Sequence, residues 1–261
     1  MVIKDENRGA RVWALIHGVA GAEAVSVAHV CRAVGLSAGT DGASLSLVTG
    51  LDRRTLLHAT DETARRVDAL QFLLGEGPCM DAWTQGGPVL VADLDSGVSR
   101  TRWPWFAASA LEAGAGALFA FPLQVGAIRP GVLVLYRAGP GSLSGEQLAD
   151  ALVFARTALA VTLDTVGPLG MGDRSSAGPA PEAGAGGLGE DRAEVYQATG
   201  MVAVQLSAGL DEALVRLRAH AFASGESLPE VAQQVLDRVL RFAPEGGGVG
   251  SGGGGGVGSD E

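Results

Sequence analysis

One stretch of the chain has a composition that neither a helix nor a strand tolerates, and it divides the sequence into two blocks. Residues 166–189 read VGPLGMGDRSSAGPAPEAGAGGLG, in which Gly, Pro, Ala and Ser dominate and no apolar period persists. Segments of this kind behave as flexible linkers. We therefore expect a long N-terminal domain over residues 10–165 and a short C-terminal domain over residues 190–243, joined by this linker.

The two ends of the chain are expected to lie outside both domains. Residues 1–9 are expected to form an N-terminal arm. Ten of the sixteen residues from 246 to 261 are Gly, without the G-X-Y period that collagen requires. A disordered Gly-rich tail over residues 244–261 is the simplest interpretation.

The N-terminal block alternates between helical and extended apolar patterns. Val12, Leu15 and Val19 follow helical spacing, and we expect a single helix that continues to about Val34. Further helices are expected over 62–74 and over 148–163, the last one preceded by a capping box at 144–147. Extended segments are expected at 43–48, 55–60, 88–94, 116–125 and 131–137. Because four of these segments form two hairpins, the predicted fold class is α+β, an antiparallel sheet with helices covering one face.

The C-terminal block has helical periodicity throughout. Its first helix carries Val195 and Val202 on one face, and its second carries Leu210 to Ala221 and ends at Gly225. A third helix follows a capping box that begins at Ser227. We therefore predict an all-α three-helix bundle, too small to be very stable alone, which docks on a partner or dimerises.

Charge and cysteine content exclude several classes of function. The net charge is −10, from 29 acidic and 19 basic residues, which argues against binding long duplex DNA through bulk electrostatics. The two cysteines, Cys31 and Cys79, form no disulfide framework, and the four histidines form no metal-binding pattern. We predict no cofactor, no metal site and no catalytic site.

The sequence predicts no membrane-spanning helix. The longest uncharged run lies between Glu112 and Arg129 and is interrupted by glycines and a proline. A spanning helix needs about 18 or more apolar residues. The N-terminus also lacks the layout of a signal peptide, so the expected location is the cytoplasm.

A motif in the N-terminal block carries a family resemblance. GEGPCMDA at residues 75–82, followed by PVLVADL at 88–94 and by RWP at 102–104, resembles the GAF sensory domains of actinobacterial regulators. The resemblance covers residues 10–165. It implies a sensor for an unidentified small-molecule or protein signal. The residues that such a sensor could use to bind its ligand are Cys79, Met80, Trp83 and Trp103.

The C-terminal block resembles the ANTAR domain, a three-helix RNA-binding module, over residues 194–242. The matching pieces are VYQATGM at 195–201, DEAL at 211–214, LRAHA at 217–221 and LPEVA at 228–232. The resemblance implies transcription antitermination, in which the domain binds paired hairpins in a nascent leader RNA and prevents a terminator from forming. It also implies a homodimer.

Six residues are the candidates for contact with RNA. They are Ala198, Thr199 and Gly200 on the first helix, and Arg216, Arg218 and His220 on the second. Two features depart from the family pattern: Thr199 stands where Lys is frequent, and residues 190–243 carry five Arg against eight Asp and Glu, a net of −3. RNA binding would then depend on shape and loop bases more than on charge.

Each candidate residue has a competing explanation. The small residues at 198–200 are equally suited to close helix packing. Arg218 lies beside the apolar face of its helix and could form a salt bridge with an acidic neighbour. Cys79 falls at the second position of a short helix, where the helix dipole favours a thiolate, yet a buried packing role is also possible. Three alternative functions follow: a DNA-binding helix-turn-helix regulator, a GAF-type thiol redox enzyme centred on Cys79, and a protein-interaction module.

Overall fold

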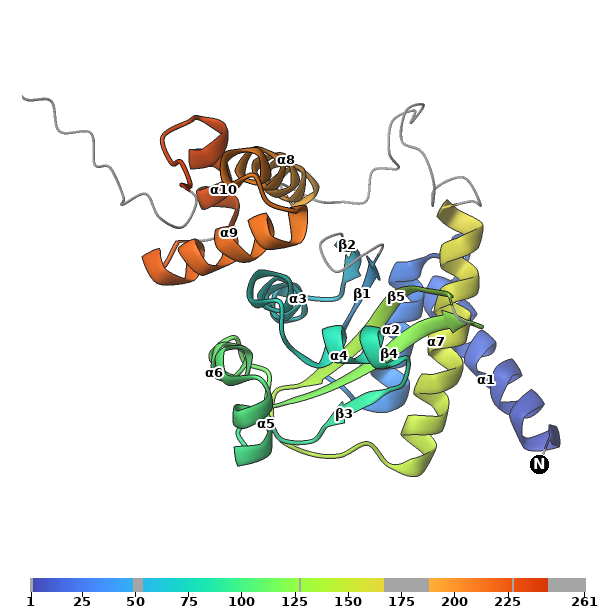
Figure 1. Cartoon of the computed structure of the whole chain (residues 1–261). Helices are drawn as coiled ribbons and strands as arrows, with labels where there is room; N and C mark the ends of the chain where they lie inside the picture. Colours follow the sequence, from blue (N-terminus) through green and yellow to red (C-terminus); the bar gives the residue numbers. More distant parts are fainter. Residues whose placement is uncertain (1, 49–53, 127, 167–187, 227, 244–261) are drawn as a thin grey trace, which may run out of the picture. The chain divides into compact units, whose positions relative to one another are not determined.

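The computed structural model describes residues 2–48, 54–126, 128–166, 188–226 and 228–243. The chain forms two compact units, Met1–Gly186 and Gly187–Glu261. Most of the expected linker and the whole expected Gly-rich tail lie outside the described residues. Figure 1 shows the helices and strands of both units, coloured along the sequence.

The first unit is built on a five-stranded antiparallel sheet with the order β2-β1-β5-β4-β3. The strands are β1 (Gly42–Val48), β2 (Arg54–Ala59), β3 (Val89–Val91), β4 (Ala117–Val125) and β5 (Ile128–Arg137). Both predicted hairpins are confirmed, β1 with β2 and β4 with β5. The strand expected over 88–94 is shorter than predicted, and it forms one edge of the sheet.

Helices cover both faces of this sheet. On one face lie α1 (Val2–Ala20), α2 (Val27–Ala38) and α7 (Gly145–Val166). On the other lie α3 (Glu62–Leu74), α4 (Pro78–Gln85) and α6 (Pro104–Glu112), the last preceded by the short α5 (Gly97–Arg102). The expectation that helices cover one face only is wrong. Successive residues of a strand point to opposite faces, and in β4 both sets are apolar, so both faces need a cover.

The helix expected to run from Val12 to about Val34 is in fact two helices. Its predicted start is also too late, because residues 2–9 form the first turns of α1. The chain leaves α1 at Gly21, whose φ of 60° is the left-handed conformation that suits glycine. α2 then begins after Ser26, whose backbone N–H donates to His29 Nδ1 at 3.3 Å. Apolar spacing persists across the break because both helices pack on the same core.

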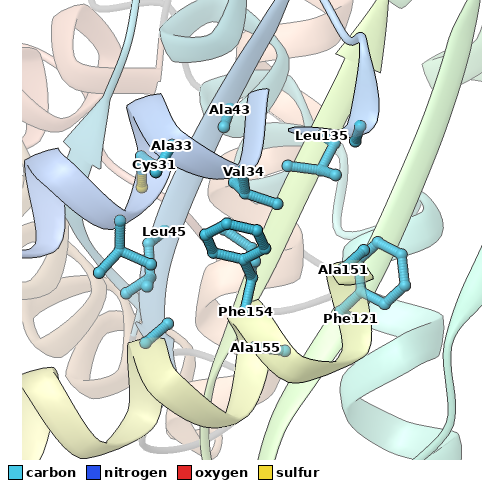
Figure 2. Close-up of a cluster of buried hydrophobic side chains, with 14 of the residues drawn as sticks. Cys31, Ala33, Val34, Ala43, Leu45, Phe121, Leu135, Ala151, Phe154 and Ala155 are labelled. Carbon is cyan, nitrogen blue, oxygen red and sulfur yellow. The ribbon is translucent and has the colours of Figure 1, made fainter. Parts of the chain in front are cut away.

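Two apolar cores result, one on each side of the sheet. The core under α1, α2 and α7 contains Leu45, Phe121 and Leu135 from the strands and Phe154 from α7, all with no exposed surface (Figure 2). The second core lies under α3, α4 and α6. The predicted capping box of α7 is confirmed. Gln147 N–H donates to Ser144 Oγ at 3.2 Å, and Ser144 N–H donates to Gln147 Oε1 at 2.8 Å.

A polar cluster fastens α1 to α7 and α2. The Asp150 carboxylate on α7 accepts hydrogen bonds from Arg8 and Arg11 of α1 and from Ser37 of α2. Burial alone would raise the pKa of Asp150, but these three donors outweigh it and lower the pKa below its usual value. Arg8 also pairs with Glu146 at 2.7 Å. Asp150 therefore joins α7 to α1 through two ion pairs and to α2 through a hydrogen bond from a neutral hydroxyl.

The second unit is a three-helix bundle, as predicted. Its helices are α8 (Leu188–Leu206), α9 (Leu210–Ser224) and α10 (Leu228–Leu236). Its core is formed by the apolar side chains Val195, Val202, Leu214, Leu217, Val231 and Val235. Gly225 ends α9 in the left-handed conformation with a φ of 73°, as the sequence predicts. The capping box expected for α10 includes Ser227, which lies outside the described residues.

Replacement of Asp150 by Asn should lower the free energy of unfolding of the first unit at pH 7 by about 2 kcal/mol, because Arg8 and Arg11 lose a charged partner. A carboxyl group whose pKa is lower in the folded than in the unfolded state stabilises the fold at any pH above its unfolded-state pKa. This stabilisation disappears as the pH falls through the folded-state pKa. The difference between wild type and variant should therefore shrink below a pH of about 4. Urea titrations at several pH values measure it.

Glu146→Gln is the matched control for this experiment. Glu146 contacts the same Arg8, but its side chain is 71% exposed, so its loss should cost less than about 1 kcal/mol. If the two variants were equally stable at pH 7, the Asp150 cluster would not fasten α1 in the way described.

Candidate ligand site and nucleic-acid interface

The GEGPCMDA motif forms a tight turn between α3 and α4. Gly75 ends α3 with a φ of 66°, and Gly77 follows with a φ of 128°. A Cβ at Gly77 would lie 2.8 Å from Gln71 Cγ and 2.9 Å from Gln71 Oε1. Position 77 therefore requires glycine, both for its backbone conformation and for the close approach of Gln71.

Polar side chains of the same motif region hold three helices in place. Gln71 Oε1 on α3 accepts from Cys79 N–H at the start of α4, at 2.7 Å. Glu76 Oε1 accepts from Trp105 N–H at 2.8 Å and from Phe106 N–H at 2.7 Å, so its carboxylate caps the N-terminus of α6. The motif thus supplies an acceptor for two backbone N–H groups at the start of α6, which have no partner within the helix.

Asp81 extends this scaffold to the RWP segment. Its Oδ2 pairs with Arg102 Nη2 at 2.6 Å and accepts from Trp103 Nε1 at 3.2 Å. Arg102 also lies over the Trp103 ring, 4.9 Å from its centroid. The motif and the RWP segment, which together carry the family resemblance, are therefore joined by contacts that build the fold.

Cys79 is fully buried at the second position of α4, behind Pro78. Burial raises the pKa of its thiol to about 11, Arg54 opposes this shift, and Asp68 adds to it. Burial raises the pKa of Cys31 to about 12. The two thiols lie in the cores on opposite faces of the sheet. The helix position predicted for Cys79 is correct, but desolvation outweighs the helix dipole, and the thiol is protonated at neutral pH.

The four residues suggested for ligand binding do not all line the same hollow among those that the described residues form beside the sheet edge and α7. Trp103 is almost completely buried and lines an open hollow of about 440 Å³ beside the edge strand β3. The described lining includes Pro88, Leu90, Asp93, Val98 and Arg102, and it contains neither Cys79, Met80 nor Trp83. Trp83 instead donates from Nε1 to the Arg129 carbonyl at 2.9 Å and so ties α4 to β5. Met80 is half-buried on α4.

A buried ion pair in the second core is a feature that the sequence reasoning missed. Arg54 of β2 pairs with Asp68 of α3, and both side chains are almost fully buried. Ser46 Oγ of β1 donates to the same Asp68 Oδ1 at 2.6 Å. A signal for it exists in the sequence, because Asp68 adjoins Val67 and precedes Gln71 by three positions on the buried side of the helix.

In the helical unit, the three small residues of α8 have different environments. Ala198 and Thr199 are buried, and Thr199 Oγ1 donates to the Val195 carbonyl one turn earlier, at 2.7 Å. Gly200 is only half-buried, and a Cβ placed there would meet no atom within 4 Å. Among the described residues of this unit, neither packing nor backbone conformation explains a glycine at position 200.

The three candidates on α9 lie on two sides of the helix. At about 100° per residue, Arg216 and His220 fall on one side, and Arg218 lies about 160° away from Arg216. Arg216 and Arg218 are half-buried. The His220 ring contacts the Phe242 ring edge to face, with centroids 5.6 Å apart and planes at 72°. A single surface cannot engage all three α9 candidates in the same way.

The segment after α10 returns to the bundle, which the sequence reasoning did not foresee. Arg238 N–H donates to the Val235 carbonyl at 3.1 Å, and Val239 N–H donates to the Gln234 carbonyl at 2.9 Å. This bonding is that of a Schellman motif, whose left-handed position is occupied by Arg238 with a φ of 61°. A non-glycine residue in this conformation costs about 1 kcal/mol.

Metal-ligand clusters and long apolar helices are both absent from the described residues. No group of three or more His, Cys, Asp or Glu side chains among them is placed to hold a metal ion. Across the same residues, no helix is both long and apolar enough to cross a bilayer.

Comparison of the sequence with known families identifies both units. The GAF domain profile matches residues 26–160, and the ANTAR domain profile matches residues 189–236. The chain therefore belongs to the GAF domain family. More particularly, it is a protein in which a GAF domain is followed by an ANTAR domain.

Solved structures similar to the chain include further GAF domains. That of an Acinetobacter phosphoenolpyruvate-protein phosphotransferase is 13% identical, with 62% of this chain and 94% of that chain covered and a TM-score of 0.44. That of the Coxiella burnetii phosphotransferase is 14% identical, with coverage of 60% and 94% and a TM-score of 0.43. Comparison with curated proteins gives no match.

Gly77→Ala should destabilise the first unit by roughly 2 kcal/mol or more, because the new Cβ is strained at this φ and collides with Gln71. Gly97→Ala is the control. A Cβ at Gly97 meets nothing within 4 Å, so that variant should change stability by less than about 1 kcal/mol. Thermal unfolding of both variants measures the contrast, and equal melting temperatures would contradict the structural role of the motif.

Proposed function

We propose that this protein is a signal-responsive RNA-binding transcription antiterminator of the cytoplasm. In this proposal the ANTAR unit binds paired hairpins in a leader RNA as part of a homodimer, and the GAF unit controls the RNA-competent population in response to a small-molecule or protein signal. The supporting observation is the presence of both domains in one chain, the GAF domain over 26–160 and the ANTAR domain over 189–236.

Gly200 supports an interface on α8. Glycine inside a helix costs about 0.5–1 kcal/mol relative to alanine, and no neighbour among the described residues 188–226 and 228–243 requires it. A bare backbone at this point permits close approach of an external partner. Ala198 and Thr199, being buried, would contribute by shaping the helix surface and not through their own side chains.

The charge of the unit limits how it could hold RNA. Residues 190–243 carry a net charge of −3, so neutralisation of many phosphates is not available to this unit. Single-stranded loop bases offer stacking and hydrogen-bonding surfaces that do not depend on net charge. This mode of binding favours hairpin loops over duplex DNA, because binding a duplex requires a basic surface.

The buried thiols disfavour the redox alternative. Reactive cysteines are exposed thiolates with a lowered pKa, whereas Cys79 has a raised pKa and no exposed surface. The remaining alternatives, a DNA-binding regulator and a protein-interaction module, are separated from the proposal by binding measurements.

The whole 261-residue chain should prefer an RNA with two tandem hairpins over a single hairpin and over duplex DNA of equal length. With about three to five phosphates contacted, the logarithm of affinity should fall with the logarithm of salt concentration at a slope of roughly −2 to −4. Fluorescence anisotropy across salt concentrations measures both. Equal affinity for all three nucleic acids would contradict the proposal, and so would the absence of binding to any of them at low salt.

Gly200→Ala should separate stability from RNA affinity. The variant should unfold with a free energy about 0.5–1 kcal/mol higher, because alanine favours the helix and the new methyl group meets nothing in the unit. Its affinity for the tandem hairpins should nevertheless fall by roughly tenfold, about 1.4 kcal/mol.

Gly9→Ala in α1 provides the comparison, since a Cβ there also meets no atom within 4 Å. It should raise helix stability to the same extent and leave RNA affinity unchanged. Undiminished RNA binding by Gly200→Ala would place the interface elsewhere on the unit.

A further inference from the structure

The segment 237–243 lies beyond the matched ANTAR region, which ends at residue 236, yet it is firmly positioned on the bundle. The Schellman turn after α10 reverses the chain direction. The Phe242 N–H then donates to Gln205 Oε1 of α8 at 2.8 Å, and the Phe242 ring meets His220 of α9. The short segment therefore contacts both of the other helices.

Phe242 is held but not covered. Its backbone N–H is bonded to Gln205, and its ring packs edge to face against the His220 ring. The residue as a whole is only half-buried. An aromatic ring that is fixed in position before binding presents a π-face at low entropic cost. Such a ring is suited to stack on a planar group such as a nucleic-acid base.

Cationic side chains accompany this ring. Arg241 precedes Phe242 directly and is exposed, and Arg216 lies on the same side of α9 as His220. Arg238 is exposed at the turn that starts the segment. Two acidic side chains accompany these arginines: Asp237, which accepts a hydrogen bond from Gln233 at 3.0 Å, and Glu212, which lies one turn before Arg216 on α9. Three arginines, Arg216, Arg238 and Arg241, thus belong to the part of the unit that carries Phe242, although residues 190–243 have a net charge of −3.

Arg238 has a backbone conformation that is unusual for arginine. Glycine normally occupies the left-handed position of a Schellman motif because a side chain is unfavourable there. Arg238 occupies it with a φ of 61°. Its side chain is exposed, so packing within the unit does not account for the choice of arginine.

We propose that residues 237–243 form a recognition surface for unpaired bases in the loops of RNA hairpins. One loop base stacks on Phe242, and Arg238 and Arg241 contact the phosphates on either side of it. Gln205 and His220 are positioning residues that hold the ring. This inference rests on the proposed RNA-binding function and extends its interface to a segment outside the ANTAR match.

The test uses the full-length chain and the tandem-hairpin RNA. Phe242→Leu keeps an apolar side chain of similar size against His220 but removes the stacking face, and should weaken binding by roughly 5- to 100-fold. Phe242→Trp should bind at least as tightly as wild type. Neither variant should change the melting temperature by more than a few degrees. A purely structural role would instead be served by Leu, and equal RNA affinity of Phe242→Leu and wild type would overturn the proposal.

Arg238→Gly and Arg241→Gln test the charges. Arg238→Gly should increase thermal stability, because glycine suits the left-handed turn, and should still reduce RNA affinity. Each variant should make the salt slope less steep by about 0.7, the loss of one phosphate contact. Arg156→Gln, an exposed arginine of α7 in the other unit, is the control and should change neither quantity. Unchanged slopes in both test variants would count against the proposal.

Phe222→Leu distinguishes this surface from a rival one. Phe222 is 49% exposed and lies one turn from Arg218, on the other side of α9 from His220. If RNA affinity fell for Phe222→Leu and not for Phe242→Leu, this inference would be wrong while the proposed function stood. If the wild-type protein bound no RNA, both would fail together.

Discussion

The central β4–β5 hairpin imposes the constraint on which the first unit depends, because its side chains are apolar on both faces. Phe119 and Phe121 of β4 face one core, whereas Leu118 and Ala120 face the other. A sheet buried on both sides needs helices on both sides. The sequence supplies α1, α2 and α7 for one face, and α3, α4 and α6 for the other. The polar contacts of Asp150, Glu76 and Gln71 then fix those helices where burial alone would leave them free to slide.

Local patterns predicted most of the elements, and non-local burial accounts for what they missed. The β1–β2 hairpin and α3 follow from residues close in sequence, as do the Gly225 stop and the Ser144 cap. The run 117–123, ALFAFPL, is continuously apolar, which is typical of a strand covered on both faces. The prediction of helices on one face followed from the two hairpins alone and took no account of this run. The break at Gly21 was missed because the apolar positions of α1 and α2 share one core and so retain a common spacing.

The candidate residues illustrate the difference between a motif that identifies a family and one that forms a site. Gly77, Cys79 and Trp103 belong to the recognisable motifs, yet each is explained by a turn, a buried contact or a hydrogen bond within the fold. Sequence patterns could find them because tight local geometry allows few residue types. Phe242 gives no such signal, since its placement beside His220 and Gln205 depends on a chain reversal at an arginine, where sequence rules expect glycine.

An acidic RNA-binding unit would face a physical problem that its architecture could solve. With a net charge of −3 over residues 190–243, long-range electrostatics repel a phosphate chain, so each binding event must rely on a few short-range contacts. Stacking on one or two rings supplies specificity for loop bases but only modest affinity. Two such units joined in a dimer convert the second hairpin contact into an intramolecular event, governed by effective concentration instead of free concentration. On the proposed function, affinity would then be set by whether two ANTAR units are presented together. A GAF domain that changed this presentation would control RNA binding without touching the RNA.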